Sequence, residues 1–193
     1  MRPWRLWGEM SPALRNLLVG DILIRFCERI PDVFVVLWCM EAIRSPVTAF
    51  QFGWLSAIEQ ITAVLCYIPV AHYADRFGKK WFVVATFGFF TLFPLVLLFS
   101  ERLLWLVPAF VVRGLKEFGE PTRKALIMDL APEGRKAGMF GLYYLVRDVI
   151  VSFAALGGGW LWAVEPRLNL LVAFGFGVAG TLWFAMRGKD ATA

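Results

Sequence analysis

The sequence predicts an all-α membrane protein with six transmembrane helices. Of its 193 residues, 59% are hydrophobic and only 18% are charged, and the mean hydropathy is +0.64. An average globular domain is about half apolar and about a quarter charged. The excess of apolar side chains is therefore expected to face lipid. This excludes a cytosolic enzyme, a disulfide-stabilised secreted domain, a disordered chain and a nucleic-acid binder, despite the net charge of +5.

The apolar residues gather in runs long enough to cross a bilayer, which takes roughly 20 residues. Short charged or Pro- and Gly-containing breaks separate these runs, among them residues 75–80 and 121–136. Nothing remains for a soluble domain or a cleavable signal peptide, so the whole chain is expected to form a single membrane domain. The six expected helices are residues 14–43, 51–72, 81–99, 102–120, 137–163 and 168–187.

The first expected helix carries several charges on one face. At about 100° per residue, Asp21, Arg25, Glu28 and Asp32 fall within an arc of roughly 60°. Arg25 can pair with Glu28 at i,i+3 and with Asp21 at i,i+4. An ionised side chain at the bilayer centre costs at least about 2.5 kcal/mol, so this stripe is expected to face a protein interior or a wet cavity.

The later helices divide into charged and uncharged ones. The second carries Glu59 and ends at His72, which we expect to be solvated. The third and sixth carry none of these charges. The fourth has a mixed stripe of Arg113, Lys116, Glu117 and Glu120, which ends at Pro121. The fifth has Arg147 and Asp148, each preceded four residues earlier by a tyrosine, Tyr143 or Tyr144.

Four arginines, Arg25, Arg29, Arg113 and Arg147, fall at a similar depth near the middle of their helices. Two interpretations stay open. The charges form either a substrate or proton pathway or a set of internal ion pairs that fixes helix packing without a ligand. The candidate pathway comprises Arg25, Glu28, Arg29, Asp32, Glu59, Arg113, Lys116, Glu117, Tyr143, Arg147 and Asp148.

The distribution of basic residues predicts the orientation of the chain. Cytoplasmic loops collect Lys and Arg, and one side of the expected bundle has 12 of them, Arg123 included, against three on the other side. Both ends of the chain are therefore expected in the cytoplasm. Metal and disulfide sites are not expected, because Cys27, Cys39 and Cys66 lie in apolar runs without CxxC spacing. We also expect no cofactor and no enzyme, because no nucleophile elbow, metal-ligand spacing or phosphate loop is found.

The segment Ala71-His72-Tyr73-Ala74-Asp75-Arg76-Phe77-Gly78-Lys79-Lys80 resembles the G-x-x-x-D-R-x-G-R-K loop of the major facilitator superfamily. The first Gly of that pattern is Ala71 here. Arg113 to Ala125 is similar to the Arg motif of the family's fourth helix, although Lys116-Glu117 replaces the usual Gln-Gly. Asp129 to Arg135 resembles the following D-x-x-P-x-x-R loop. Gly157-Gly158-Gly159 is similar to the end of the family's antiporter motif without its Pro.

This resemblance implies one half of a twelve-helix fold, built from two inverted three-helix repeats at about residues 1–99 and 100–193. It implies a half-size secondary transporter of an unidentified small solute, working by alternating access with a second copy or another membrane subunit in a bacterial inner membrane. The implied conformational latch is Asp75, Arg76, Gly78, Lys79 and Lys80. The alternative is a non-transporting subunit or scaffold of a larger membrane complex.

Overall fold

The computed structural model describes residues 3–190, and of residues 3–5 and 67–77 the backbone alone. Every regular element in this range is helical, which confirms the all-α prediction. The elements are α1 (Pro3–Glu9), α2 (Pro12–Arg29), α3 (Phe34–Leu37), the π-helical turn η1 (Trp38–Ala42), α4 (Ala49–Phe77), α5 (Lys79–Phe99), α6 (Leu103–Leu115), α7 (Glu120–Leu130), α8 (Lys136–Val164) and α9 (Pro166–Arg187).

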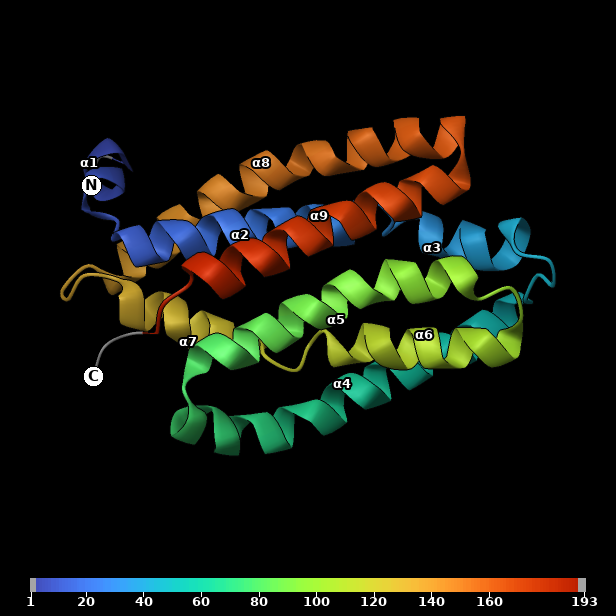
Figure 1. Ribbon diagram of the computed structural model, residues 1–193, viewed down its shortest axis with the longest axis horizontal. Coiled ribbons are helices and arrows are strands. Elements are labelled where there is room, and N and C mark those ends of the chain that lie inside the picture. Colours follow the sequence, from blue (N-terminus) through green and yellow to red (C-terminus); the bar gives the residue numbers. More distant parts are fainter. Residues whose placement is uncertain (1–2, 191–193) are drawn as a thin grey trace.

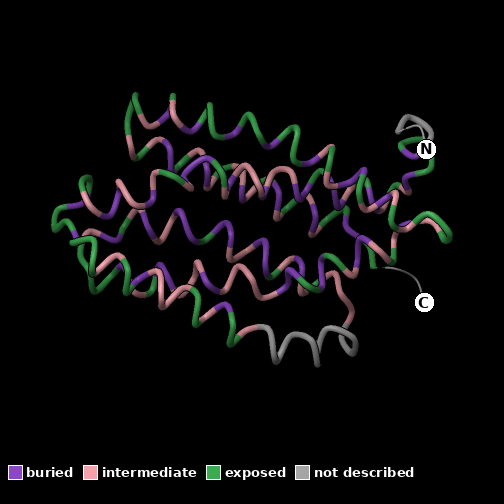
Figure 2. Tube along the Cα trace, turned by 180° about the vertical axis from the view of Figure 1, so that it is seen from behind, coloured by how far each residue is buried: buried purple, intermediate pink, exposed green. Residues whose placement is uncertain are grey.

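The long helices run side by side along the longest axis of the molecule (Figure 1). α8 and α4 lie at opposite edges of this bundle, and α2, α5, α6 and α9 lie between them. The most extensive packing joins α5 with α9, α2 with α9 and α4 with α6. Buried residues gather on the middle helices, whereas exposed residues follow the outer side of α8 (Figure 2).

The first expected helix, residues 14–43, is broken in its middle. α2 ends at Arg29 and α3 begins at Phe34, because Pro31 has no N–H to donate and cannot continue the helix. Asn169 of α9 stabilises this break, since its Nδ2 donates to the carbonyl oxygens of Ile30 at 3.2 Å and of Gly158 at 2.9 Å. A methyl group added at Gly158 would lie 2.3 Å from the Ile30 oxygen, so α8 reaches the break through a glycine.

The fourth expected helix is also broken, and its expected following loop is partly helical. α6 ends at Leu115, a turn follows, and α7 occupies Glu120–Leu130 within a stretch predicted to be a break at 121–136. Gly119 permits this turn to lie against α5, because a methyl group there would meet Thr86 Oγ1 at 2.3 Å. Pro121 is accommodated in the first turn of α7, where its missing N–H costs nothing.

The expected latch loop at 75–80 is shorter than predicted. α4 continues to Phe77 and α5 begins at Lys79, so Gly78 alone separates the two helices. Its φ of +84° is a conformation that residues with a side chain rarely adopt. The side chains of His72, Asp75 and Arg76 lie outside the described residues.

By length and hydropathy, three helices of the described residues are able to cross a membrane, namely α5, α8 and α9. α2 differs from these because five of its 18 residues are charged, and α6 because it has only 13 residues. The described residues therefore form an all-helical fold with three helices of membrane-spanning length, and six spans arranged as two inverted repeats stay a prediction.

Candidate functional site

Asp21 of α2 is the centre of a buried cluster of charges. Its carboxylate is fully buried, and Arg123 of α7 donates to its Oδ2 at 2.5 Å. Two groups of α8 also reach this oxygen, the Tyr143 hydroxyl at 2.9 Å and Arg147 Nη1 at 3.4 Å. Arg25 Nε lies 3.6 Å from the other oxygen. Asp21 therefore holds α2, α7 and α8 together through opposite charges.

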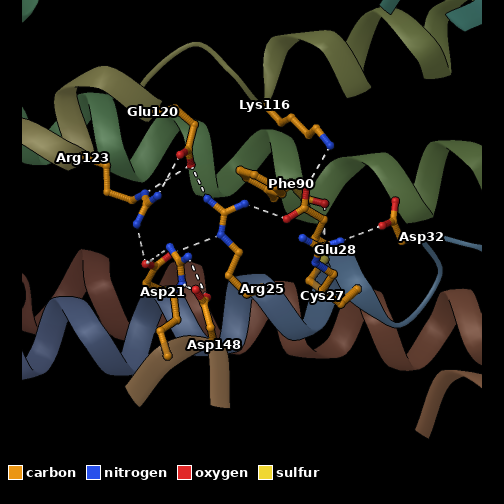
Figure 3. Close-up of polar contacts among 12 residues, drawn as sticks. Asp21, Arg25, Cys27, Glu28, Asp32, Phe90, Lys116, Glu120, Arg123 and Asp148 are labelled. Carbon is orange, nitrogen blue, oxygen red and sulfur yellow. Dashed lines mark hydrogen bonds and ion pairs between the residues drawn. The ribbon is translucent and has the colours of Figure 1, made fainter. Parts of the chain in front are cut away.

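Arg25 connects this centre to two further carboxylates, one turn along α2 and across on α7 (Figure 3). Its Nη1 donates to Glu28 at 2.7 Å and its Nη2 to Glu120 at 2.6 Å. Glu120 also accepts from Arg123 at 2.7 Å, and Glu28 accepts from Lys116 at 2.9 Å.

These hydrogen bonds and ion pairs link the side chains into one continuous charge network, in which positive and negative groups alternate. It begins in the turn after α6, crosses α2 and α7, and ends on α8. Because cations and anions are equal in number, the network is electrically neutral in a region where an unpaired ion would be costly. Its members, in order of contact, are Lys116, Glu28, Arg25, Glu120, Arg123, Asp21, Arg147 and Asp148.

A second, smaller group surrounds Arg113 of α6. This guanidinium lies 3.2 Å from Glu59 of α4 and 3.4 Å from Asp32, and it packs over the rings of Phe93 and Phe110. A narrow space between the two groups, lined in part by Glu28 and Lys116, has a volume of about 10 Å³. This is room for about one water molecule, so this space is too small for a solute.

The outer members of the network are accessible. The side chains of Arg29 and Asp148 are 57% and 62% exposed, compared with 16% for Arg25. Arg29 pairs with Asp32 at 3.1 Å, and Asp148 with Arg147 at 2.7 Å. Arg29 and Asp148 are therefore accessible from outside the protein, whereas Arg25 is largely enclosed.

Among the predicted pathway residues, the structure brings together Arg25, Glu28, Lys116, Tyr143, Arg147 and Asp148 in one chain of contacts and Arg113, Glu59, Asp32 and Arg29 in another. Glu117 lies half-buried in the turn between α6 and α7. Their role as a pathway stays a prediction.

Four participants were not among the predicted pathway residues: Asp21, Glu120, Arg123 and Tyr144. Arg123 was counted as a loop residue on the cytoplasmic side, and the loop assignment was wrong, since Arg123 lies in α7 and its side chain is 1% exposed. Two signals in the sequence pointed to this position. Gly119-Glu120-Pro121 is typical of a helix start, and Glu120 and Arg123 have the i,i+3 spacing of a helical ion pair. Tyr144 places its ring 4.1 Å from the Arg147 guanidinium, a cation–π contact.

Comparison with known proteins gives the family. The family model described as Major Facilitator Superfamily matches residues 17–192 of the chain. The chain belongs to the major facilitator superfamily. The resemblance inferred from the short motifs is therefore confirmed, and the match includes every residue of the buried charge network. Members of this superfamily are membrane transporters, so this chain is an integral membrane protein of a transporter family.

Two relatives are similar to this major facilitator chain over most of its length. An uncharacterized MFS-type transporter, YqjV, of Bacillus subtilis is 25% identical over 171 residues, which are 86% of this chain and 40% of the relative. A protein of Planococcus maritimus named Na(+), Li(+), K(+)/H(+) antiporter is 27% identical over 172 residues, 85% of this chain and 39% of the relative. The chain thus spans about two fifths of the length of these curated relatives.

In this superfamily member, Gly78, Lys79 and Lys80 of the predicted latch lie at the junction of three segments. Lys79 Nζ lies 2.5 Å from Asp129 at the end of α7, and the backbone N–H of Lys80 donates to Asp190 at 2.7 Å. A side chain at Gly78 would meet Asp190 as well, with the added carbon 2.9 Å from Oδ2. The start of α5 is therefore tied to both α7 and the segment after α9.

Proposed function

We propose that this chain supplies one six-helix half of a secondary transporter of the major facilitator type. In this proposal residues 1–193 form a single domain of two inverted repeats, about 1–99 and 100–193. The domain pairs with a second six-helix half, a second copy or another membrane segment. Both ends of the chain lie in the cytoplasm at a bacterial inner membrane, and the pair moves a small solute by alternating access.

The observation that carries this proposal is the exposure of Arg29 and Asp148. Asp148 lies near the midpoint of the 29-residue helix α8, and Arg29 lies beside the break in the first long helical segment. Charged side chains at this depth do not face hydrocarbon, because the cost is several kcal/mol per group. They require a wet cavity or a covering partner, and a second transporter half supplies both.

The alternating chain of charges gives a physical route for coupling. A small rotation between helices exchanges one opposite-charge partner for the next, so the ion pairs are conserved in number while the helices move. In the proposal, the pathway residues predicted from the sequence take part in this exchange. Lys79 and Lys80, with Gly78, Asp75 and Arg76, act as the latch that holds the cytoplasmic ends of α5 and α7 together.

A second candidate is a non-transporting scaffold that keeps the fold within a larger membrane complex. The observation that favours it is the internal neutrality of the buried network, which satisfies its own charges without a ligand. The two candidates differ in the state of assembly and in solute flux.

Native mass spectrometry of the tagged chain, extracted in mild detergent, tests the pairing. A homodimer of the 21.9 kDa chain, or a complex with one six-helix partner, is the expected result. A large complex of unrelated subunits would instead support the scaffold.

Flux in proteoliposomes tests transport by the assembled protein. An isotope-labelled bacterial metabolite extract is the solute probe, and Na⁺, K⁺ and H⁺ gradients are applied in turn, because the Planococcus relative is named for these ions. We expect accumulation that is lost in Arg113→Ala, retained in part in Arg113→Lys, and unchanged in Arg44→Ala, whose side chain is 80% exposed in a loop. Absence of accumulation in an intact pair would contradict the proposal.

A further inference from the structure

An open groove lies between α2 and α8 at the outer edge of the charge network. Its volume is about 240 Å³, and its lining residues are Arg29, Asp148, Val151, Ser152 and Ala155. Pockets for drug-sized ligands measure about 300–1,000 Å³, so this groove is the size of a smaller solute. It is lined by one cation and one anion, while the buried network beneath it is already paired.

Arg29 and Asp148, the two charged residues of the groove, each have hydrogen-bonding atoms that no other described residue uses. Both bonds from Arg147 reach the same oxygen of Asp148, Oδ1, at 2.8 and 2.7 Å. Among the described residues, no hydrogen bond reaches Asp148 Oδ2. Arg29 donates from Nη1 to Asp32, and within the same part of the chain its Nη2 and Nε have no acceptor. A carboxylate oxygen and two guanidinium donors are therefore available to a ligand.

Ser152 adds a third polar group on the side of Asp148. The two residues are separated by one helical turn, so they lie on the same face of α8. The Ser152 hydroxyl donates to the Val149 carbonyl at 2.7 Å, which leaves its oxygen lone pairs free to accept. Asp148 Oδ2 and Ser152 Oγ together form an acceptor pair suited to an ammonium group, whereas Arg29 is suited to a carboxylate.

We propose that this groove binds a small zwitterion, with its ammonium group at Asp148 and Ser152 and its carboxylate at Arg29. The assignment rests on the proposed transport function and names the solute class for it. A bare cation would be repelled by Arg29, and a simple anion by Asp148, since like charges placed together oppose binding. Val151 and Ala155 supply the apolar wall for the carbon atoms between the two charges.

The coupling of such a ligand to the rest of the protein follows from the contacts of Asp148. Its partner Arg147 also contacts Asp21, the centre of the buried charge network, at 3.4 Å. An ammonium group bound to Asp148 competes with Arg147 for the Asp148 carboxylate. The interaction of Arg147 with Asp21 then becomes stronger. Binding at the surface groove thereby changes the balance of ion pairs among α2, α7 and α8.

Protection of a thiol in the groove tests the proposal without requiring flux. The full-length Ala155→Cys variant is made in a Cys66→Ala background, in which the remaining native cysteines, Cys27 and Cys39, are buried. The alkylation rate by a maleimide is measured in the assembled protein, with added protein α-amino acids, β-alanine or γ-aminobutyrate. These compounds place ammonium and carboxylate at increasing separations. Controls are acids and amines of the same length with a single charge.

We expect at least one zwitterion to slow alkylation about tenfold at saturation, whereas the singly charged compounds leave the rate unchanged. Arg29→Gln and Asp148→Asn should each raise the required concentration by about tenfold or more, which corresponds to about 1.4 kcal/mol. The Arg29 side chain is more than half exposed, so the melting temperature of Arg29→Gln is expected to stay close to that of the parent. In Asp148→Asn, Arg147 keeps Asp21 as a partner, and the melting temperature of this variant is measured alongside its affinity.

Three results would overturn the proposal: no zwitterion protects, singly charged compounds protect equally, or the thiol is unreactive because a partner covers the groove. Because protection is measured at equilibrium, its failure is separable from failure of transport. Flux without protection rejects the zwitterion alone, and protection without flux rejects the transporter while leaving the binding site.

Discussion

At the scale of single residues, the buried carboxylate of Asp21 has the largest consequences. It is the common partner of Arg123, Arg147 and Arg25, and the hydroxyl of Tyr143 donates to the same carboxylate. Removing one member of a buried ion pair is more damaging than removing both, because the remaining charge is left desolvated and unpaired. Arg123, which is as deeply buried, loses its closest partner if the Asp21 charge is removed.

We expect Asp21→Asn to lower the free energy of unfolding by about 3–5 kcal/mol, because it removes the carboxylate that Arg123 and Arg147 share and leaves the buried network one negative charge short. Thermal or denaturant unfolding in detergent micelles measures this loss. The matched control is Glu101→Gln, in which the carboxylate pairs with Arg44 at the surface, and the expected loss is about 1 kcal/mol or less. Equal losses in the two variants would show that the buried network does not stabilise the fold.

The spacing of residues predicted some of these contacts and not others. Both Arg25 pairs on α2 were expected from i,i+3 and i,i+4 spacing, and both occur in the structure. The contact of Arg123 with Asp21 joins residues 102 positions apart. Local periodicity carries no information on that contact, because it depends on which face of α7 packs against α2.

At the scale of elements, the interruption of the first helical segment is the feature that shapes the site. The break at residues 30–33 follows Arg29, the last residue of α2, which lines the groove. Asp32 lies within the break and pairs with Arg113. Two neighbours fix the break, since Asn169 donates to the Ile30 carbonyl and Gly158 lets α8 approach that carbonyl closely. Pro31 can be recognised in the sequence as a helix breaker. The contacts of Asn169 and Gly158 with the break cannot be recognised there.

The three consecutive glycines of α8 provide a matched pair for testing this contact. Gly158→Ala would place a methyl group 2.3 Å from the Ile30 oxygen, whereas a methyl group at Gly157 meets nothing within 4 Å. We expect Gly158→Ala to destabilise the protein by about 1–3 kcal/mol through overpacking. Gly157→Ala should be neutral or stabilising by up to about 1 kcal/mol, because Ala is the better helix former. Unfolding midpoints in detergent distinguish the two, and equal shifts would contradict the close approach.

At the scale of the whole molecule, ion pairs that involve loops and helix ends lie at two opposite ends of the bundle. At one end, Arg44 pairs with Glu101 at 2.8 Å, next to Arg167. At the other end, Lys79 pairs with Asp129, and Arg135 pairs with Glu9. The second end is the one rich in basic residues, and removing buried Arg123 from the cytoplasmic count leaves the same bias.

This asymmetry predicts the orientation in the membrane. In intact cells, a Ser45→Cys variant should react with an impermeant maleimide, and a Glu133→Cys variant should react only after the membrane is permeabilised. Both positions are exposed in loops, and the Cys66→Ala background removes the one native thiol that is not buried. The opposite labelling pattern would reverse the topology, and labelling of both positions in intact cells would contradict a membrane-spanning arrangement of the segments between them.

The sequence by itself determined the helical class, the membrane environment, the family and the charged stripes of α2. These properties depend on composition, short motifs and spacing within one helix, all of which are local. Only the tertiary structure decided that Asp21 is the centre of the network, that Arg123 is buried, and that Arg29 and Asp148 share a groove. Those facts depend on which helix faces meet, and the electrostatic cost of an unpaired charge then selects the partner that neutralises it.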